Sequence, residues 1–352
     1  MGLALAVWMT SGGLAEEALE RGKQLLEKGE IDAAIAQFDQ AVQQAPKSAQ
    51  AYFYRGNAYL SKPDLDKALV ELNKAIELDA NFADAYVNRG VVYDQKGQAA
   101  KALADYDRAI VLNPKDADTF VKRGALYDEQ GDMIKALVDY SEALRLNPKD
   151  AEVYYYRGNV LRNLGKDDRA IEDYTAAIRL DPNYADAYLN RGAAYDDRSE
   201  TEKALADLNE AVRLNPKDPL AYFNRGNVYW SKGNLPLAII NYTEALRLNP
   251  KDADAYVNRG IAYRKQGEFD KALADFNAAV VLDPKNPETY TLRAWVYEQK
   301  GDKVMALADQ EKARQLRAAS GAAAPGQPSA PPPVQPSNQP PARRLPPLPR
   351  VY

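Results

Sequence analysis

Small and apolar residues return every three or four positions along most of the chain, as in Ala102, Tyr106 and Ala109. Residues with this spacing lie on one face of an α-helix. A matching stretch begins sixteen residues earlier, with Tyr86 and Gly90. The pattern therefore predicts two amphipathic helices, in which bulky rings and small residues let the helices approach closely.

A longer period is superimposed on the helical one. Glycine recurs every 34 residues, and Ala294 follows in step after Gly22, Gly56, Gly90, Gly124, Gly158, Gly192, Gly226 and Gly260. Counting each unit from seven residues before these positions gives nine units over 15–320, without insertion or deletion. A fixed period of this length is the signature of a repeat architecture.

Turn residues divide each unit into two halves. Glycine at unit position 15 suits a left-handed helix end, and proline at position 32 marks a helix that has already ended. Position 34 is predicted to cap the next helix, with Ser48, Asp116, Asp150, Asp218, Asp252 and Asn286. Pro63 and Ser199 replace the glycine of position 15. We predict an all-α solenoid of stacked helix hairpins.

The units resemble the tetratricopeptide repeat family. The match rests on segments such as 253–260, with sequence ADAYVNRG, followed by Tyr263, Gly267, Ala272 and Phe276. The resemblance covers residues 15–320 and implies a right-handed superhelix of antiparallel helix pairs, whose first helices line a concave groove. Gln310 replaces the aromatic residue of position 24 in the last unit, as expected of a solvent-facing end.

Residues 1–14 precede the repeats. Their apolar run, Leu3 to Met9, is too short to span a bilayer. With small Gly13 and Ala15 before Glu16, the segment resembles a secretory signal peptide, although it lacks a basic start. We expect export to the periplasm or outside the cell if residues 1–15 are a signal peptide. Otherwise the protein is cytoplasmic, with a disordered start or a misassigned initiation codon.

Residues 321–352 follow the repeats and are rich in proline and alanine. This composition predicts a disordered tail, because the segment has too little apolar area to fold. Its end, 343–350 (RRLPPLPR), resembles a ligand of SH3 domains. The alternative is a solubilising or wall-spanning tail.

The composition excludes several chemistries. The 352 residues include no cysteine and no histidine, so there is no thiolate or imidazole to bind zinc, to act as a nucleophile or to carry a lipid anchor. No phosphate-binding loop or nucleophile–base pair is present either. The net charge of −4 combines a tail of +3 with a remainder of −7, and an acidic body is poorly suited to nucleic acid. We expect a non-enzymatic protein without cofactor, metal or stable membrane anchor.

Arginine occupies unit position 7 in all nine units. Position 23 on the second helix is mostly acidic, so equal periods predict inter-helix ion pairs: Arg89 with Asp105, Arg123 with Asp139, and Arg157 with Asp173. The alternative is a row of arginines that binds carboxylates or phosphates. Of the 23 tyrosines, 18 lie at positions 4, 11 and 24 and are predicted to be core residues.

Asparagine at positions 6 and 9 is the candidate binding feature. These positions face the groove in the family, where a side-chain amide can donate to and accept from a peptide backbone. The candidates are Asn57, Asn88, Asn159, Asn190, Asn224, Asn227 and Asn258, with Trp230 as an aromatic anchor. The alternatives are tolerated polar residues and a tryptophan that fills a gap.

The remaining groove positions are apolar at position 5 and largely acidic at position 2. They favour a basic or apolar extended segment of a partner protein. We therefore expect an interaction scaffold. The alternative is an accessory or assembly subunit of an envelope or enzyme complex, which makes contact through its tail or convex face.

Overall fold

The computed structural model describes residues 11–320, and every regular element among them is an α-helix. The chain forms two compact parts, an N-terminal part up to Val160 and a C-terminal part from Leu161. Their boundary falls inside helix α9 (Ala151–Asn163). The predicted all-α class is confirmed.

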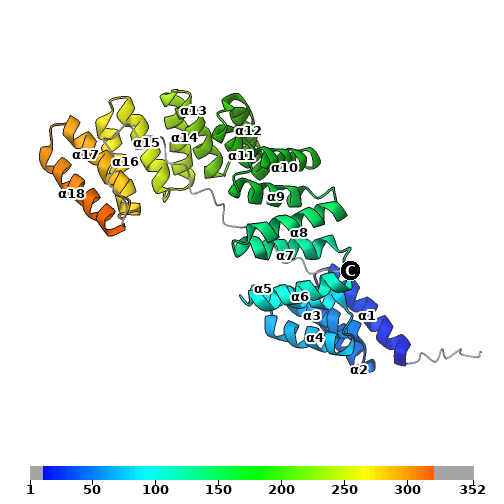
Figure 1. The fold of residues 1–352 in the computed structure, drawn as a ribbon. Coiled ribbons are helices and arrows are strands. Elements are labelled where there is room, and N and C mark those ends of the chain that lie inside the picture. Colours follow the sequence, from blue (N-terminus) through cyan, green and yellow to red (C-terminus); the bar gives the residue numbers. More distant parts are fainter. Residues whose placement is uncertain (1–10, 321–352) are drawn as a thin grey trace, which may run out of the picture. The chain divides into compact units, whose positions relative to one another are not determined.

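The N-terminal part consists of helix hairpins that stack on one another (Figure 1). Its helices are α1 (Ser11–Glu27), α2 (Ile31–Gln44), α3 (Ala49–Ser61), α4 (Leu65–Leu78), α5 (Ala83–Gln95), α6 (Ala99–Leu112), α7 (Ala117–Glu129), α8 (Met133–Leu146) and most of α9. The two helices of a unit contact each other, as α5 and α6 do, and the second helix contacts the first helix of the next unit, as α6 and α7 do.

The C-terminal part repeats this arrangement (Figure 1). After the end of α9 it contains α10 (Asp167–Leu180), α11 (Ala185–Asp197), α12 (Thr201–Leu214), α13 (Pro219–Ser231), α14 (Leu235–Leu248), α15 (Ala253–Lys265), α16 (Phe269–Leu282), α17 (Pro287–Gln299) and α18 (Lys303–Ser320). Consecutive first helices also contact each other, for example α11 with α13 and α15 with α17. No helix among residues 11–320 is long and apolar enough to cross a bilayer.

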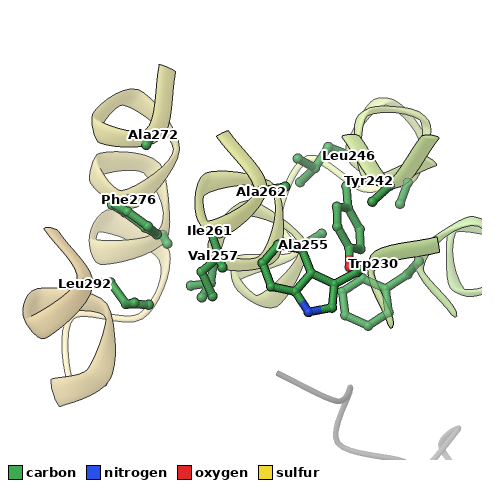
Figure 2. Packing of buried hydrophobic residues seen from close by; sticks show 14 of the residues in the cluster. Trp230, Tyr242, Leu246, Ala255, Val257, Ile261, Ala262, Ala272, Phe276 and Leu292 are labelled. Atoms are coloured by element: carbon green, nitrogen blue, oxygen red, sulfur yellow. The ribbon is translucent and has the colours of Figure 1, made fainter. Parts of the chain in front are cut away.

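The core of each unit is built from small residues around one bulky side chain. Ala102 and Ala109 are buried on either side of Tyr106, whose ring lies against Gly90. A Cβ atom at Gly90 would lie 2.6 Å from that ring, so only glycine fits there. The ring of Tyr242 lies against Gly226 in the same way in the C-terminal part, and Figure 2 shows the core cluster to which Tyr242 and Trp230 belong.

The last unit departs from this scheme in a consistent way. Gln310 stands in place of the ring, and Ala294 stands in place of the glycine. Ala294 is buried, whereas Gln310 is exposed and donates to Glu298 at 2.5 Å. The predicted solvent-facing role of Gln310 is confirmed.

The turn between the two helices of a unit requires a left-handed residue. Glycine has positive φ at this position in seven units: Gly29, Gly97, Gly131, Gly165, Gly233, Gly267 and Gly301. Ser199 keeps the same turn with φ of 59°, and Pro63 also has positive φ. The turn geometry therefore persists where glycine is absent.

Most of the predicted caps are present. Side-chain oxygens accept from backbone N–H groups of the next helix at Ser48, Asp150, Asp218, Asp252 and Asn286. Asp116 is the exception, because its carboxylate makes no cap bond and instead accepts from the hydroxyl of Thr119.

The structure bears differently on the two ends of the chain. Helix α1 begins at Ser11, four residues before the first predicted unit. The predictions for the leader before Ser11 and for the tail 321–352 lie outside the described residues.

Candidate functional site

The arginine at unit position 7 joins three helices. Arg123 on α7 donates from Nε and Nη2 to both carboxylate oxygens of Asp139 on α8, at 2.8 and 2.7 Å. Its Nη1 donates to Asp107 on α6, in the preceding unit, at 2.6 Å. The guanidinium group is therefore hydrogen-bonded on both of its open edges, and it links two consecutive units.

The pattern recurs along the chain. The same two-oxygen or single-oxygen contact with the position-23 acid is made by Arg55 with Glu71, Arg89 with Asp105, Arg191 with Asp207, Arg259 with Asp275 and Arg293 with Asp309. Arg157 donates to Ser141 at 3.3 Å, and Asp173 is buried in the C-terminal part. Arg225 meets Asn241 and Asn209 instead of an acid.

Tyrosines flank these arginines. The guanidinium carbon of Arg89 lies 5.4 Å from the ring centre of Tyr86 and 5.8 Å from that of Tyr93. Both distances permit a cation–π interaction. The expectation that positions 4 and 11 belong to the core is thus only partly correct, because Tyr86 and Tyr93 are half-buried beside a charge. The sequence indicates this contact, because Tyr86 lies three residues before Arg89 and Tyr93 four residues after it, on the same face of the helix.

Four of the candidate asparagines are paired inside the molecule. Asn88 donates to Asn57 at 2.7 Å, and Asn258 donates to Asn227 at 3.1 Å. Asn227 also accepts from the hydroxyl of Tyr242 at 2.9 Å. All four asparagines are buried. Their amides thus already serve the contact between neighbouring first helices, and their expected role in holding a peptide stays a prediction.

The other candidates are divided between interior and surface. Asn190 is buried, whereas Asn159 and Asn224 are half-buried. Trp230 is 9% exposed and packs in the core, with the ammonium group of Lys265 lying 4.3 Å from its ring centre. The tryptophan is thus mainly a packing residue, and Lys265 covers one face of its ring.

Charged and aromatic side chains lie along unit position 12 on three consecutive first helices of the C-terminal part. We call this set the position-12 row: Asp196 on α11, Trp230 on α13 and Arg264 on α15, with their neighbours Asp197, Lys265 and Trp295. Asp197 is paired with Arg162 at 2.6 Å. Among residues 11–320, no hydrogen bond or ion pair reaches the side chain of Asp196, Arg264 or Lys265.

Burial shifts the pKa values of two charged groups in this row. Asp196 is half-buried, and the loss of solvation, with a smaller contribution from neighbouring Asp197, raises its pKa to about 6. Burial likewise lowers the pKa of Arg264, whose guanidinium carbon lies 4.9 Å from the ring centre of Trp295. Charged groups that lose water without gaining a partner are unfavourable in a free protein.

The contacts along this row follow fixed residue separations between units, which a comparison of single repeat positions does not reveal. Residues on adjacent first helices meet at separations of 31, as in Arg264 and Trp295, or 35, as in Arg162 and Asp197. The separation of 31 also joins Asn57 to Asn88. A search at these two spacings finds the cross-unit contacts and shows which charges lack them.

The outer side of the last helix carries exposed apolar residues. Val304 and Leu307 on α18 are 78% and 64% exposed, and Met305 is 41% exposed. In earlier units the residue equivalent to Leu307, such as Leu273, packs against the core. Met305 stands where most units have lysine or arginine.

Comparison with known proteins identifies the repeats. Models described as "Tetratricopeptide repeat" match residues 19–81, 83–116, 223–287 and 257–328. A model described as "TPR repeat" matches residues 127–165, 158–196 and 197–233. Together these matches cover most of the chain. A search of curated proteins found no match.

Two solved structures show the same fold, and a third is similar over part of the chain. A tetratricopeptide repeat protein from Parabacteroides merdae is 23% identical with a TM-score of 0.53, over 70% of this chain and 98% of that one. A chain of the APC/C hetero-tetramer Cut9-Hcn1 is 20% identical with a TM-score of 0.53, over 87% of this chain and 74% of that one. MamA is 28% identical over 47% of this chain and 96% of its own, with a TM-score of 0.45.

Proposed function

The chain belongs to the tetratricopeptide repeat family, whose repeats form protein interaction scaffolds, and from this premise we propose that it binds an extended segment of a partner protein along its first helices. The role is non-enzymatic. The family supplies the scaffold, and the unpaired charges of the position-12 row indicate which surface of this chain takes the partner.

The observation that carries the proposal is a contrast between two kinds of polar side chain. The position-7 arginines and the paired asparagines form hydrogen bonds within the molecule, as Arg123 and Asn258 do. Asp196 and Arg264 are half-buried and have no such partner among residues 11–320. A partner protein can supply the missing interaction. Asp196 and Arg264 are therefore better suited to binding a partner than to stabilising the fold.

The charge of the surrounding surface supports a basic or apolar partner. Asp254 at unit position 2 is half-buried, and burial together with Asp252 and Asp283 raises its pKa. A basic group of a partner near these carboxylates would offset both the loss of solvation and the repulsion between the carboxylates. Residues 1–317 carry a net charge of −7, which attracts cationic segments over longer distances.

Site-specific cross-linking tests the proposal. A photoreactive residue would replace Lys265, which is exposed on first helix α15, or Lys271, which is exposed on second helix α16 of the same unit. We expect partner adducts from position 265 and none from position 271. Adducts from position 271 alone would contradict binding along the first helices.

A second candidate function is assembly through the last helix. Val304, Met305 and Leu307 expose apolar area on α18, and exposed apolar patches mark interaction surfaces. Replacing Val304 and Leu307 together by Asp should abolish a complex formed there without reducing helicity. Light scattering of the full chain, mixed with the uncross-linked partner that the cross-linking experiment identifies, would measure the mass of the complex. An unchanged complex would contradict assembly through α18.

A further inference from the structure

We infer that the position-12 row binds a segment of mixed charge, in which a basic side chain pairs with Asp196 and an acidic side chain pairs with Arg264 and Lys265. This inference rests on the proposed function and adds the chemistry of the ligand. All three charged side chains lie on first helices of the C-terminal part, Asp196 on α11 and Arg264 and Lys265 on α15.

Asp196 forms the acceptor end of the row. Two ionisable neighbours of Asp196 are already engaged: Asp197 pairs with Arg162, and the hydroxyl of Tyr242 donates to Asn227. The carboxylate of Asp196 has no hydrogen bond or ion pair from any residue in 11–320. A lysine or arginine side chain of a ligand would give it one, and charge-assisted bonds of this kind are among the stronger polar contacts.

Burial supports the same assignment. It raises the pKa of Asp196 to about 6, so the free protein holds this carboxylate in an unfavourable setting at neutral pH. A cation from a ligand would favour the ionised form again.

Arg264 and Lys265 form the donor end. Each cation lies over a tryptophan ring, Arg264 over Trp295 at 4.9 Å and Lys265 over Trp230 at 4.3 Å. A ring covers one face of a guanidinium group but leaves its N–H groups, which point outward in the plane, available to a carboxylate. No acidic side chain among residues 11–320 pairs with either cation. Two adjacent cations on aromatic rings therefore form a prepared site for an anion.

The separation of the two ends sets the spacing in the ligand. Asp196 and Arg264 occupy the same position on helices that are two units apart, α11 and α15. Packed helices are about 8–10 Å apart, so the two charges are separated by about 16–20 Å. An extended chain advances about 3.3 Å per residue, so the basic and acidic residues of the ligand should be about five or six positions apart.

The N-terminal part provides an internal control. Its residues at the same position are Leu26, Leu60, Asp94 and Asp128. Burial raises the pKa of Asp128, as it does for Asp196. No lysine or arginine occupies position 12 or 13 there, because position 13 holds Glu27, Ser61, Gln95 and Glu129. Only the C-terminal part combines both signs of charge.

The test is selection of peptides from a random twelve-residue library on the full chain. We expect enriched sequences with a basic and an acidic residue five or six positions apart. Asp196→Asn should remove the preference for the basic residue only, and Arg264→Gln with Lys265→Gln should remove the preference for the acidic residue only. Asp128→Asn is the matched control and should change neither. Circular dichroism would verify that each variant retains its helicity.

Titration of one enriched peptide, labelled with a fluorophore, gives the size of each contact. Asp196→Asn, and Arg264→Gln with Lys265→Gln, should each weaken binding by at least about tenfold, the scale of a hydrogen bond to a charged group, whereas Asp128→Asn should leave the affinity unchanged. Arg264→Glu with Lys265→Glu should recover affinity when the acidic residue of the peptide is replaced by lysine. A purely structural effect of the substitutions would not produce this recovery.

The outcomes separate the inference from the proposed function. Enriched peptides that lack the charge pair, or that respond to Asp128→Asn as strongly as to Asp196→Asn, would overturn the inference while leaving peptide binding intact. The absence of any enriched peptide would overturn both.

Discussion

A single arginine in each unit contributes more to this molecule than its charge suggests. Arg123 holds two carboxylates on different helices, and its ring neighbours, Phe120 and Tyr127, lie within about 6 Å. Its partner Asp139 is only 2% exposed. Removing one member of such a pair leaves the other without its partner in a partly dehydrated site, which is costly.

One unit of the chain provides a natural comparison for this pair, because Arg225 faces Asn241 where most units have an acid. Replacing Asp139 by Asn should lower the free energy of unfolding by about 2 kcal/mol, since hydrogen bonds to charged groups contribute on that scale. Asn241→Asp should raise it, by about 1 kcal/mol. Urea denaturation of both variants would measure this, and equal effects of the same sign would contradict an ion-pair role.

The pH dependence of stability gives a second residue-scale prediction. The pKa of Asp196 is about 6 in the folded protein, against an ordinary value of 3.8, because burial disfavours its charged form. The folded chain therefore binds this proton more tightly, and the contribution of Asp196 to stability falls as the pH rises from about 4 to about 6. Asp197 and Tyr242 interact electrostatically with Asp196, and Asp197 is itself paired with Arg162.

Asp196→Asn should remove that fall and make the protein more stable than the parent at pH 7. Thermal denaturation at intervals between pH 4 and 7 would show a smaller slope for the variant. If the two chains kept parallel profiles over this range, the carboxylate would not be held in an unfavourable setting.

At the scale of one side chain, the sequence predicted the position-7 pairs because two residue types with equal periods lie on facing helices. It did not anticipate the hydrogen bond between Asn57 and Asn88, since a repeat position identifies the face of a helix but not the neighbour on the next unit. Their contact spans 31 residues and joins positions 9 and 6 of consecutive units. The unpaired state of Asp196 is harder still to predict, because it depends on every surrounding side chain.

At the scale of elements, helices and turns followed closely from the repeat. Glycine at position 8 was predicted as a packing residue, and the approach of Tyr106 to Gly90 supplies the reason. The cap at Asp116 was wrong because the carboxylate found a competing donor, the hydroxyl of Thr119, one turn ahead. Local propensity cannot choose between two donors that are equally near in sequence.

The turn after α11 provides the element-scale prediction. Ser199 has φ of 59°, in a region that costs a residue with a Cβ atom about 1 kcal/mol or more, whereas seven other units use glycine there. Ser199→Gly should therefore raise the free energy of unfolding, by up to about 1 kcal/mol after the greater flexibility of the unfolded chain is counted. Gly165→Ser, at the equivalent turn, is the converse control and should destabilise. Denaturation midpoints that do not move in opposite directions would contradict this account.

At the scale of the whole molecule, repetition explains why residues 11–320 form a series of similar layers and not one large core. The two helices of each unit bury their small residues against each other and against the next unit. Stability therefore grows as similar layers are added. The two compact parts differ in the surface they present, since only the C-terminal part carries both signs of charge at positions 12 and 13. We therefore expect the binding specificity of this array to depend on the residues that depart from the repeat.

The last whole-molecule prediction concerns the first helix and the location of the protein. We propose that the chain is exported and cleaved before Glu16, because small residues at Gly13 and Ala15 suit a signal peptidase. Cleavage would remove the first turn of α1 but keep Ala18 and Leu19, which pack against the core of the first unit. The processed chain should therefore retain its helicity.

Mass spectrometry of the protein from its own cells would measure the mature N-terminus. We expect a chain that begins at Glu16 in the exported fraction, and Ala15→Lys should block the cleavage because a long charged side chain does not fit the site before the cut. An intact chain in the exported fraction would contradict processing at this site, and an intact chain found only in the cytoplasm would contradict export as well. Cleavage before Glu16 removes one buried residue, Ala15, but keeps Ala18 and Leu19 in the core of the first unit, so we expect α1 to pack against α2 in either case.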